Sequence, residues 1–94
     1  MLDPGIGFAK TAEQCWEVLA ELEKIAPVER MLVGVSRKSF LGVLTGEKEP
    51  AGRSSETLAL ELILAGRGVG MIRTHGVKAL YRGVMVMRKT GRIV

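Results

Sequence analysis

The chain has 94 residues, of which 47% are hydrophobic and 4% aromatic, and it carries a net charge of +4. This length suits one small domain, and the apolar content is too high for a disordered chain. The few aromatic residues argue against a stacking surface for single-stranded nucleic acid. The single cysteine, Cys15, excludes an internal disulfide and favours a reducing compartment, and no apolar run reaches the ~18 residues of a membrane span. We therefore expect a cytoplasmic protein that binds neither membranes nor nucleic acid.

The clearest element is a helix over residues 11–25. Thr11 and Gln14 have the spacing of a capping box, in which each side chain bonds to the other residue's backbone. Apolar residues recur at helical spacing as far as Ile25, and Pro27 ends the pattern.

Shorter elements follow the first helix. In chain order, the sequence predicts a buried strand over Met31–Val35, a surface loop over residues 44–53, a helix capped by Ser54 or Ser55 and ended by Gly66, a strand over Val69–Arg73, and a helix from about Val77. The second helix is apolar nearly all round, so we expect it to be well covered. The alternation predicts parallel strands joined by crossover helices.

The N-terminal residues do not complete this pattern. Leu2 and Asp3 resemble the end of a strand and the start of the loop that leaves it, but no apolar run precedes them. Two strands and the end of a third cannot cover three helices, because parallel sheets are buried on both faces. We expect residues 1–94 to be part of a single larger α/β domain that is incomplete at its N-terminus.

Polar residues follow each of the three predicted strands. They are Asp3 after the first, Ser36 to Ser39 after the second, and Arg73 with His75 at the end of the third. In (β/α) barrels the loops at the carboxyl ends of the strands build the active site. The three clusters are therefore predicted to converge on one site.

Each cluster also has a purely structural interpretation. Asp3 can open a turn, residues 36–39 can form a solvated turn with a capping serine, and His75 can be structural. A lone histidine without nearby cysteines makes zinc improbable, and Cys15 suits a small buried position better than a nucleophile. The prediction of a site depends on the three clusters occurring together.

Together the side chains predict a flat, polar heterocycle that carries an anionic leaving group. The Asp3 carboxylate can accept two hydrogen bonds from an amino-pyrimidine edge, and Lys38 can donate to ring oxygen or nitrogen atoms. Arg73 offers a planar fork for phosphate and can stack on a ring. His75 adds a donor whose charge changes near neutral pH.

Three segments resemble the C-terminal part of dihydropteroate synthases, members of the pterin-binding family. These are "LDPGIGFAKT", "LVGVSRKSFLG" and "GVGMIRTHGV", in this order and spacing. The resemblance implies an α/β fold that is the C-terminal portion, about three βα units, of a (β/α)8 TIM barrel with parallel strands and crossover helices. It also implies a transferase of folate biosynthesis and a sulfonamide target. Such enzymes condense dihydropterin methyl diphosphate with 4-aminobenzoate, with Mg²⁺ assistance.

The resemblance assigns roles to six side chains. It implies that Asp3, Phe8, Lys38 and Arg73 bind the pterin, with Lys38 and Arg73 catalytic. It implies that Ser39 binds the aminobenzoate carboxylate and that Arg73 and His75 hold the diphosphate. The metal ligand is expected outside this chain, so the missing N-terminal portion, or a homodimer mate, is an expected partner.

Two residues do not fit the resemblance easily. Gly76 stands where relatives usually have Asp, which removes a possible partner of His75, and Arg37 has no implied role, so we predict a structural ion pair for it. Three other functions stay open. They are a methyltetrahydrofolate-type pterin-binding methyltransferase fragment, a non-catalytic interaction or dimerisation module, and, least favoured at this modest charge, a basic nucleic-acid binder.

Overall fold

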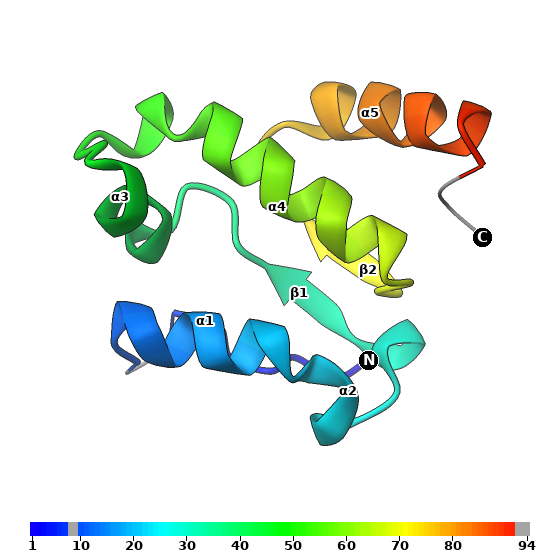
Figure 1. Cartoon of the computed structure of the whole chain (residues 1–94), viewed down its shortest axis with the longest axis horizontal. Helices are drawn as coiled ribbons and strands as arrows, with labels where there is room; N and C mark the ends of the chain where they lie inside the picture. Colours follow the sequence, from blue (N-terminus) through cyan, green and yellow to red (C-terminus); the bar gives the residue numbers. More distant parts are fainter. Residues whose placement is uncertain (8–9, 92–94) are drawn as a thin grey trace.

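The structure is a computed structural model that describes residues 1–7 and 10–91. The elements follow the chain in the order α1 (Ala12–Ala20), α2 (Leu22–Ile25), η1 (Val28–Arg30), β1 (Leu32–Gly34), α3 (Ser39–Thr45), η2 (Pro50–Gly52), α4 (Ser54–Gly66), β2 (Met71–Arg73) and α5 (Val77–Lys89). Figure 1 shows β1 in the middle of the molecule, with α1 and α2 on one side of it, α4 on the other and α5 at the far end. No helix in the described ranges is long and apolar enough to cross a bilayer.

The strands are parallel, as the sequence predicts. β1 pairs with β2 in the register Leu32↔Met71 and Gly34↔Arg73, and Leu2 forms a parallel bridge with Met31. The Leu32 N–H donates to Leu2 while the Met31 carbonyl accepts from Met71, so the two partners lie on opposite edges of β1. The parallel bridge at Leu2 agrees with the strand end predicted there, and the three parallel segments end at one edge.

The first helix begins as predicted but is interrupted. The Thr11 side chain accepts from the Gln14 N–H, and the Gln14 side chain accepts from the Thr11 N–H, which confirms the capping box. At Glu21 the backbone leaves the helical region, with φ −118° and ψ 26°, so one predicted helix becomes α1 and α2. Apolar periodicity continues across this break, and the sequence pattern therefore did not reveal it.

Three features between β1 and β2 differ from the sequence prediction. The predicted loop over residues 44–53 begins too early, because α3 runs to Thr45 and ends at Gly46, whose φ of +86° suits glycine. The serine cap of α4 is wrong: the cap residue is Arg53, and no side chain caps the helix. α4 is less covered than predicted, since Leu60 and Leu64 are buried but Ile63 is exposed.

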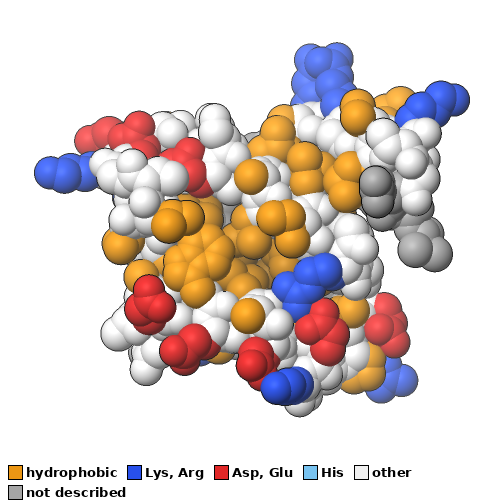
Figure 2. Space-filling view, viewed as in Figure 1, with side chains coloured by type: hydrophobic (Ala, Val, Ile, Leu, Met, Phe, Trp, Pro, Cys, Tyr) orange, Lys and Arg blue, Asp and Glu red, His pale blue; other side chains and the backbone are white. Residues whose placement is uncertain are grey.

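The core lies between β1 and helices α1, α3 and α4. Among the described residues it is a cluster of eleven buried apolar side chains, namely Ile6, Cys15, Leu19, Leu22, Met31, Val33, Val35, Phe40, Leu41, Leu60 and Leu64. Trp16 packs edge-on against Phe40 at its border, with ring centroids 5.0 Å apart. In Figure 2 hydrophobic side chains gather across the middle of the face, and acidic side chains lie along its lower rim. Cys15 is a buried free thiol, as predicted.

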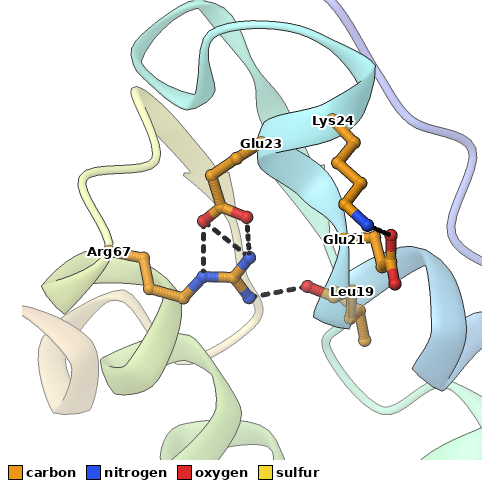
Figure 3. A network of polar contacts seen from close by, with 5 residues as sticks. All are labelled: Leu19, Glu21, Glu23, Lys24 and Arg67. Atoms are coloured by element: carbon orange, nitrogen blue, oxygen red, sulfur yellow. Dashed lines mark hydrogen bonds and ion pairs between the residues drawn. The ribbon is translucent and has the colours of Figure 1, made fainter.

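Arg67, just after α4, ties this helix to α1 and α2 (Figure 3). Its guanidinium donates to both carboxylate oxygens of Glu23, at 2.8 to 3.0 Å, and to the Leu19 carbonyl at 2.6 Å. These bonds hold the pKa of Glu23 below its usual value. Arg67 therefore links α4 to α1 and α2 at the end of the sheet away from the polar loops.

Candidate functional site

The predicted site residues converge at the carboxyl edge of the sheet. A hollow of about 160 Å³ opens there, lined by Gly34, Ser36, Lys38, Arg73, Thr74 and His75. The lining comes from the ends of β1 and β2 and from the loops that follow them, because parallel neighbours end at the same edge.

Lys38 is the half-buried cation of this hollow and the cap residue of α3. Its ammonium donates a hydrogen bond to the Ile6 carbonyl, which connects the second loop to the N-terminal loop. Burial lowers the pKa of Lys38 and the neighbouring Arg73 lowers it further, whereas the Asp3 carboxylate raises it. Two cations in one hollow favour an anionic ligand.

Arg73 extends across the backbone of β1. A Cβ atom added at Gly34 would lie 2.8 Å from the Arg73 Nη2 atom, so a side chain at this position would displace the guanidinium from where it lies. Because Gly34 and Arg73 are partners in the strand register, the guanidinium reaches the same hollow as Lys38.

His75 is held by Ser36 from the neighbouring loop. The Ser36 hydroxyl oxygen lies 2.7 Å from His75 Nδ1 and accepts a hydrogen bond from the His75 N–H at 3.2 Å. One hydroxyl therefore orients the imidazole. Ser36 was part of the predicted polar cluster but had no assigned role, and only the pairing of the two loops reveals its contact with His75.

Of the remaining predicted residues, Asp3 and Ser39 are not among those that line the hollow. Asp3 is exposed, and its Oδ1 atom accepts from the Gly5 N–H at 2.8 Å, which is the turn expected of an aspartate before Pro-Gly. The carboxylate is still close enough to Lys38 to influence its pKa. Ser39 begins α3 and is exposed but does not line the hollow, and Phe8 lies outside the described residues.

The ion pair predicted for Arg37 is wrong within the described ranges. Arg37 has an exposed side chain and adopts the left-handed conformation, with φ +61°, and its backbone rather than its side chain makes the contacts. Its N–H donates to the Thr57 hydroxyl at 3.0 Å, and its carbonyl accepts from Arg53 at 2.8 Å. The sequence shows the charge of Arg37 but does not reveal this backbone conformation.

A second, larger cavity of about 280 Å³ lies behind the first. It shares Ser36, Thr74 and His75 with the hollow and continues to Glu61 on α4. Glu61 is buried, its Oε1 atom accepts from the Thr74 hydroxyl at 2.9 Å, and its Oε2 atom has no partner among the described residues. Burial raises the pKa of Glu61, and the bond from Thr74 opposes this shift in part.

A parallel α/β unit with cations at its carboxyl edge is the arrangement of an anion-binding (β/α) barrel. Residues 1–75 match the model of the family described as pterin binding enzyme. The chain belongs to this family.

Dihydropteroate synthases are among the similar proteins. The chain is 39% identical over 80 residues to that of Neisseria meningitidis serogroup C, covering 83% of this chain and 28% of the relative. It is 37% identical over 91 residues to that of Escherichia coli K12, covering 96% and 32%. The chain thus spans about a third of the length of these relatives.

The structure is similar to solved dihydropteroate synthases. It matches the Xanthomonas albilineans enzyme in complex with 7,8-dihydropteroate with a TM-score of 0.83 and 33% identity, over 98% of this chain and 36% of that chain. It matches the same enzyme with 4-aminobenzoic acid with a TM-score of 0.85 and 32% identity, over 95% and 34%. The Yersinia pestis enzyme with a sulfonamide drug gives a TM-score of 0.84 and 35% identity, over 96% and 33%. The fold is that of about a third of a TIM-barrel enzyme.

Proposed function

We propose that this chain is the C-terminal part of a dihydropteroate synthase barrel. In this role it would help to condense dihydropterin methyl diphosphate with 4-aminobenzoate, releasing diphosphate. The convergence of Lys38, Arg73 and His75 on one hollow carries the proposal, because it supplies donors for a flat ring and for an anionic leaving group together. The similarity to dihydropteroate synthases over most of the chain supports it.

Asp3, Phe8 and Lys38 are proposed to hold the pterin. Lys38 donates to the ring, and the exposed Oδ2 side of the Asp3 carboxylate accepts from the amino-pyrimidine edge while Oδ1 keeps its turn. Phe8 shapes the same pocket. Arg73, which extends over Gly34, stacks on the pterin and reaches the diphosphate.

His75 and Ser39 complete the set of contacts. His75, oriented by Ser36, donates to the diphosphate, and Ser39 at the start of α3 meets the aminobenzoate carboxylate. In the proposed reaction the C–O bond to diphosphate breaks first, and the electron pair leaves with the diphosphate. The arylamine nitrogen then attacks the pterin-methyl cation and loses a proton. The cations stabilise the departing charge, so catalysis is mainly positioning and electrostatics.

Mg²⁺ is proposed as the cofactor that neutralises the diphosphate. No group of three or more His, Cys, Asp or Glu side chains in residues 1–7 and 10–91 is arranged to hold a metal. From the resemblance to dihydropteroate synthases we expect the residues that hold Mg²⁺ in the remainder of the barrel, and this chain's proposed part is to bind the organic groups and the diphosphate oxygens.

The remaining barrel strands are the proposed partner of this chain, in the cytoplasm, with a homodimer mate as a further partner. Among the described residues β2 pairs with β1 alone, and its side chains are mostly exposed. An open edge of this kind is a template for another strand. Supplying that strand would also bring the remaining pterin and metal ligands to the hollow.

Co-expression with the missing two thirds of a related barrel tests the proposal. We expect the isolated chain to form no dihydropteroate above background and the complemented barrel to form it. Lys38→Ala and Arg73→Ala should each lower kcat/KM about 10²-fold or more, because each removes charge from the transition state. Lys89→Ala, at the exposed end of α5, is the matched control and should leave the rate unchanged. Full turnover by Lys38→Ala in the complemented barrel would show that the proposed site is wrong.

A further inference from the structure

The described part of the chain buries three polar or charged side chains, and all three lie on one stripe of α4. Arg53, Thr57 and Glu61 are 8%, 6% and 1% exposed. They are spaced four residues apart, beginning at the cap residue of the helix, so they follow one another along a single face. Buried polar groups are costly unless they make hydrogen bonds, so their partners are informative.

Arg53 and Thr57 both bind the backbone of Arg37. Arg53 Nη1 donates to the Arg37 carbonyl at 2.8 Å, while its Nε and Nη2 atoms donate to the carbonyls of Glu47 and Lys48 at 3.0 Å. The Thr57 hydroxyl accepts from the Arg37 N–H at 3.0 Å. A left-handed conformation is unfavourable for a residue other than glycine and persists only when its surroundings hold it. These bonds therefore fix the turn that leads directly into Lys38.

Glu61 holds the other loop. Its Oε1 atom accepts from the Thr74 hydroxyl at 2.9 Å, and the same hydroxyl accepts from the Gly76 N–H at 3.0 Å. Thr74 lies between Arg73 and His75 in sequence, so both bonds restrain the segment that presents these two side chains. The buried Oε2 atom of Glu61 has no partner among the described residues, so this carboxyl costs stability.

We propose that Arg53, Thr57 and Glu61 are positioning residues that set the relative placement of the two loops of the hollow. The stripe runs over eight residues of helix, a distance of about 12 Å. A helix is stiff over this length, so Lys38 on one loop and Arg73 with His75 on the other keep a fixed separation. The expected effect of these residues on catalysis rests on the proposed function. Their expected effect on the order of the two loops does not.

The structural arm of the test uses the 94-residue chain alone. Amide hydrogen exchange, read by NMR, is compared among wild type, Thr57→Val and Glu61→Leu. Thr57→Val should speed exchange at Arg37 and Lys38, and Glu61→Leu should speed it at His75 and Gly76, each about 10-fold or more. Thr57→Ser and Glu61→Gln keep the acceptor atom and should restore protection. Leu60→Ala is the matched control, because Leu60 is buried on the same helix but makes none of the hydrogen bonds that hold the two loops.

The catalytic arm uses the complemented barrel. Thr57→Val and Glu61→Leu should each lower kcat/KM about 10-fold or more, because small misplacements of catalytic groups are costly. Glu61→Leu should do so while the Tm stays equal or rises, since it removes a buried carboxyl with an unpaired oxygen. A merely structural role would instead lower Tm and leave kcat/KM unchanged, as expected for Leu60→Ala.

The outcomes separate the two proposals. Unchanged loop exchange in both variants overturns the positioning role, whatever the activity. Faster loop exchange with an inactive wild-type barrel rejects the proposed function and keeps the positioning of the loops. Faster exchange with unaltered kcat/KM in an active barrel overturns the catalytic consequence.

Discussion

The elements around β1 differ in how completely they are packed. Helices α1, α2 and α3 contribute buried core residues, and α4, on the other side of β1 from α1 and α2, contributes Leu60 and Leu64. Beyond this core, β2 is largely exposed and α5 has no buried residue within the described range. Successive βα units of one chain thus differ, because some form a packed core while β2 and α5 remain largely exposed. Burial here depends on which neighbouring units are present, because a parallel strand needs covering from both sides.

The sharpest test of this contrast substitutes an apolar residue in each region. Leu64 is 0% exposed, so Leu64→Ala should lower the free energy of unfolding by about 2–5 kcal/mol through lost burial and a cavity. Met85 on α5 is 54% exposed, so Met85→Ala should change it by about 0.5 kcal/mol or less in the isolated chain. Urea unfolding measures both. Equal losses in the two variants would show that α5 is packed after all.

The pH dependence of stability tests the raised pKa of Glu61, the buried carboxyl of α4 that accepts a hydrogen bond from the loop after β2. Burial raises the folded-state pKa of Glu61 above 4.5, so the folded chain holds a proton that the unfolded chain has already lost. Stability should therefore be lost as the pH rises from about 4.5 through the folded-state pKa. Glu61→Gln should remove this dependence while keeping the acceptor for Thr74. Thermal unfolding from pH 4 to pH 8 measures it, and parallel pH curves for the two proteins would contradict the prediction.

The smallest expected effect comes from the ion pairs on the packed side. Arg67→Gln removes the bonds to Glu23 and weakens the contact with Leu19, so Tm should fall, but by less than in Leu64→Ala. Lys24→Gln removes an exposed pair with Glu21 and should leave Tm unchanged. Added salt should narrow the difference between wild type and Arg67→Gln. A Tm loss for Lys24→Gln as large as for Arg67→Gln would argue against the linking role of Arg67.

Much of the fold was predictable because its signals are local. The capping box at Thr11, the helix that begins at Val77 and the parallel strands follow from short patterns in the chain. The break at Glu21 was not predictable, because the helical spacing of apolar residues continues through it. The helix Ser39–Thr45 was not predictable either, because it is too short to show a helical pattern of apolar residues. Tertiary packing decides both.

The candidate site shows the same division. The polar residues after each strand indicated where the site lies, and the structure brings Lys38, Arg73 and His75 into one hollow. The assigned roles of Asp3, Ser39 and Phe8 stay predictions. The part played by Ser36 was missed, because its contact with His75 joins residues 39 positions apart.

By itself the sequence determined the starts of the first and last helices, the parallel direction of the strands and the chemistry available at the strand ends. These follow from short-range spacing and from the side chains themselves. Only the tertiary structure decided that Arg37 takes a left-handed conformation and that Arg53, Thr57 and Glu61 are buried against the loops. The physical reason is that burial and hydrogen bonding at these positions are set by partners as far as 20 residues away along the chain.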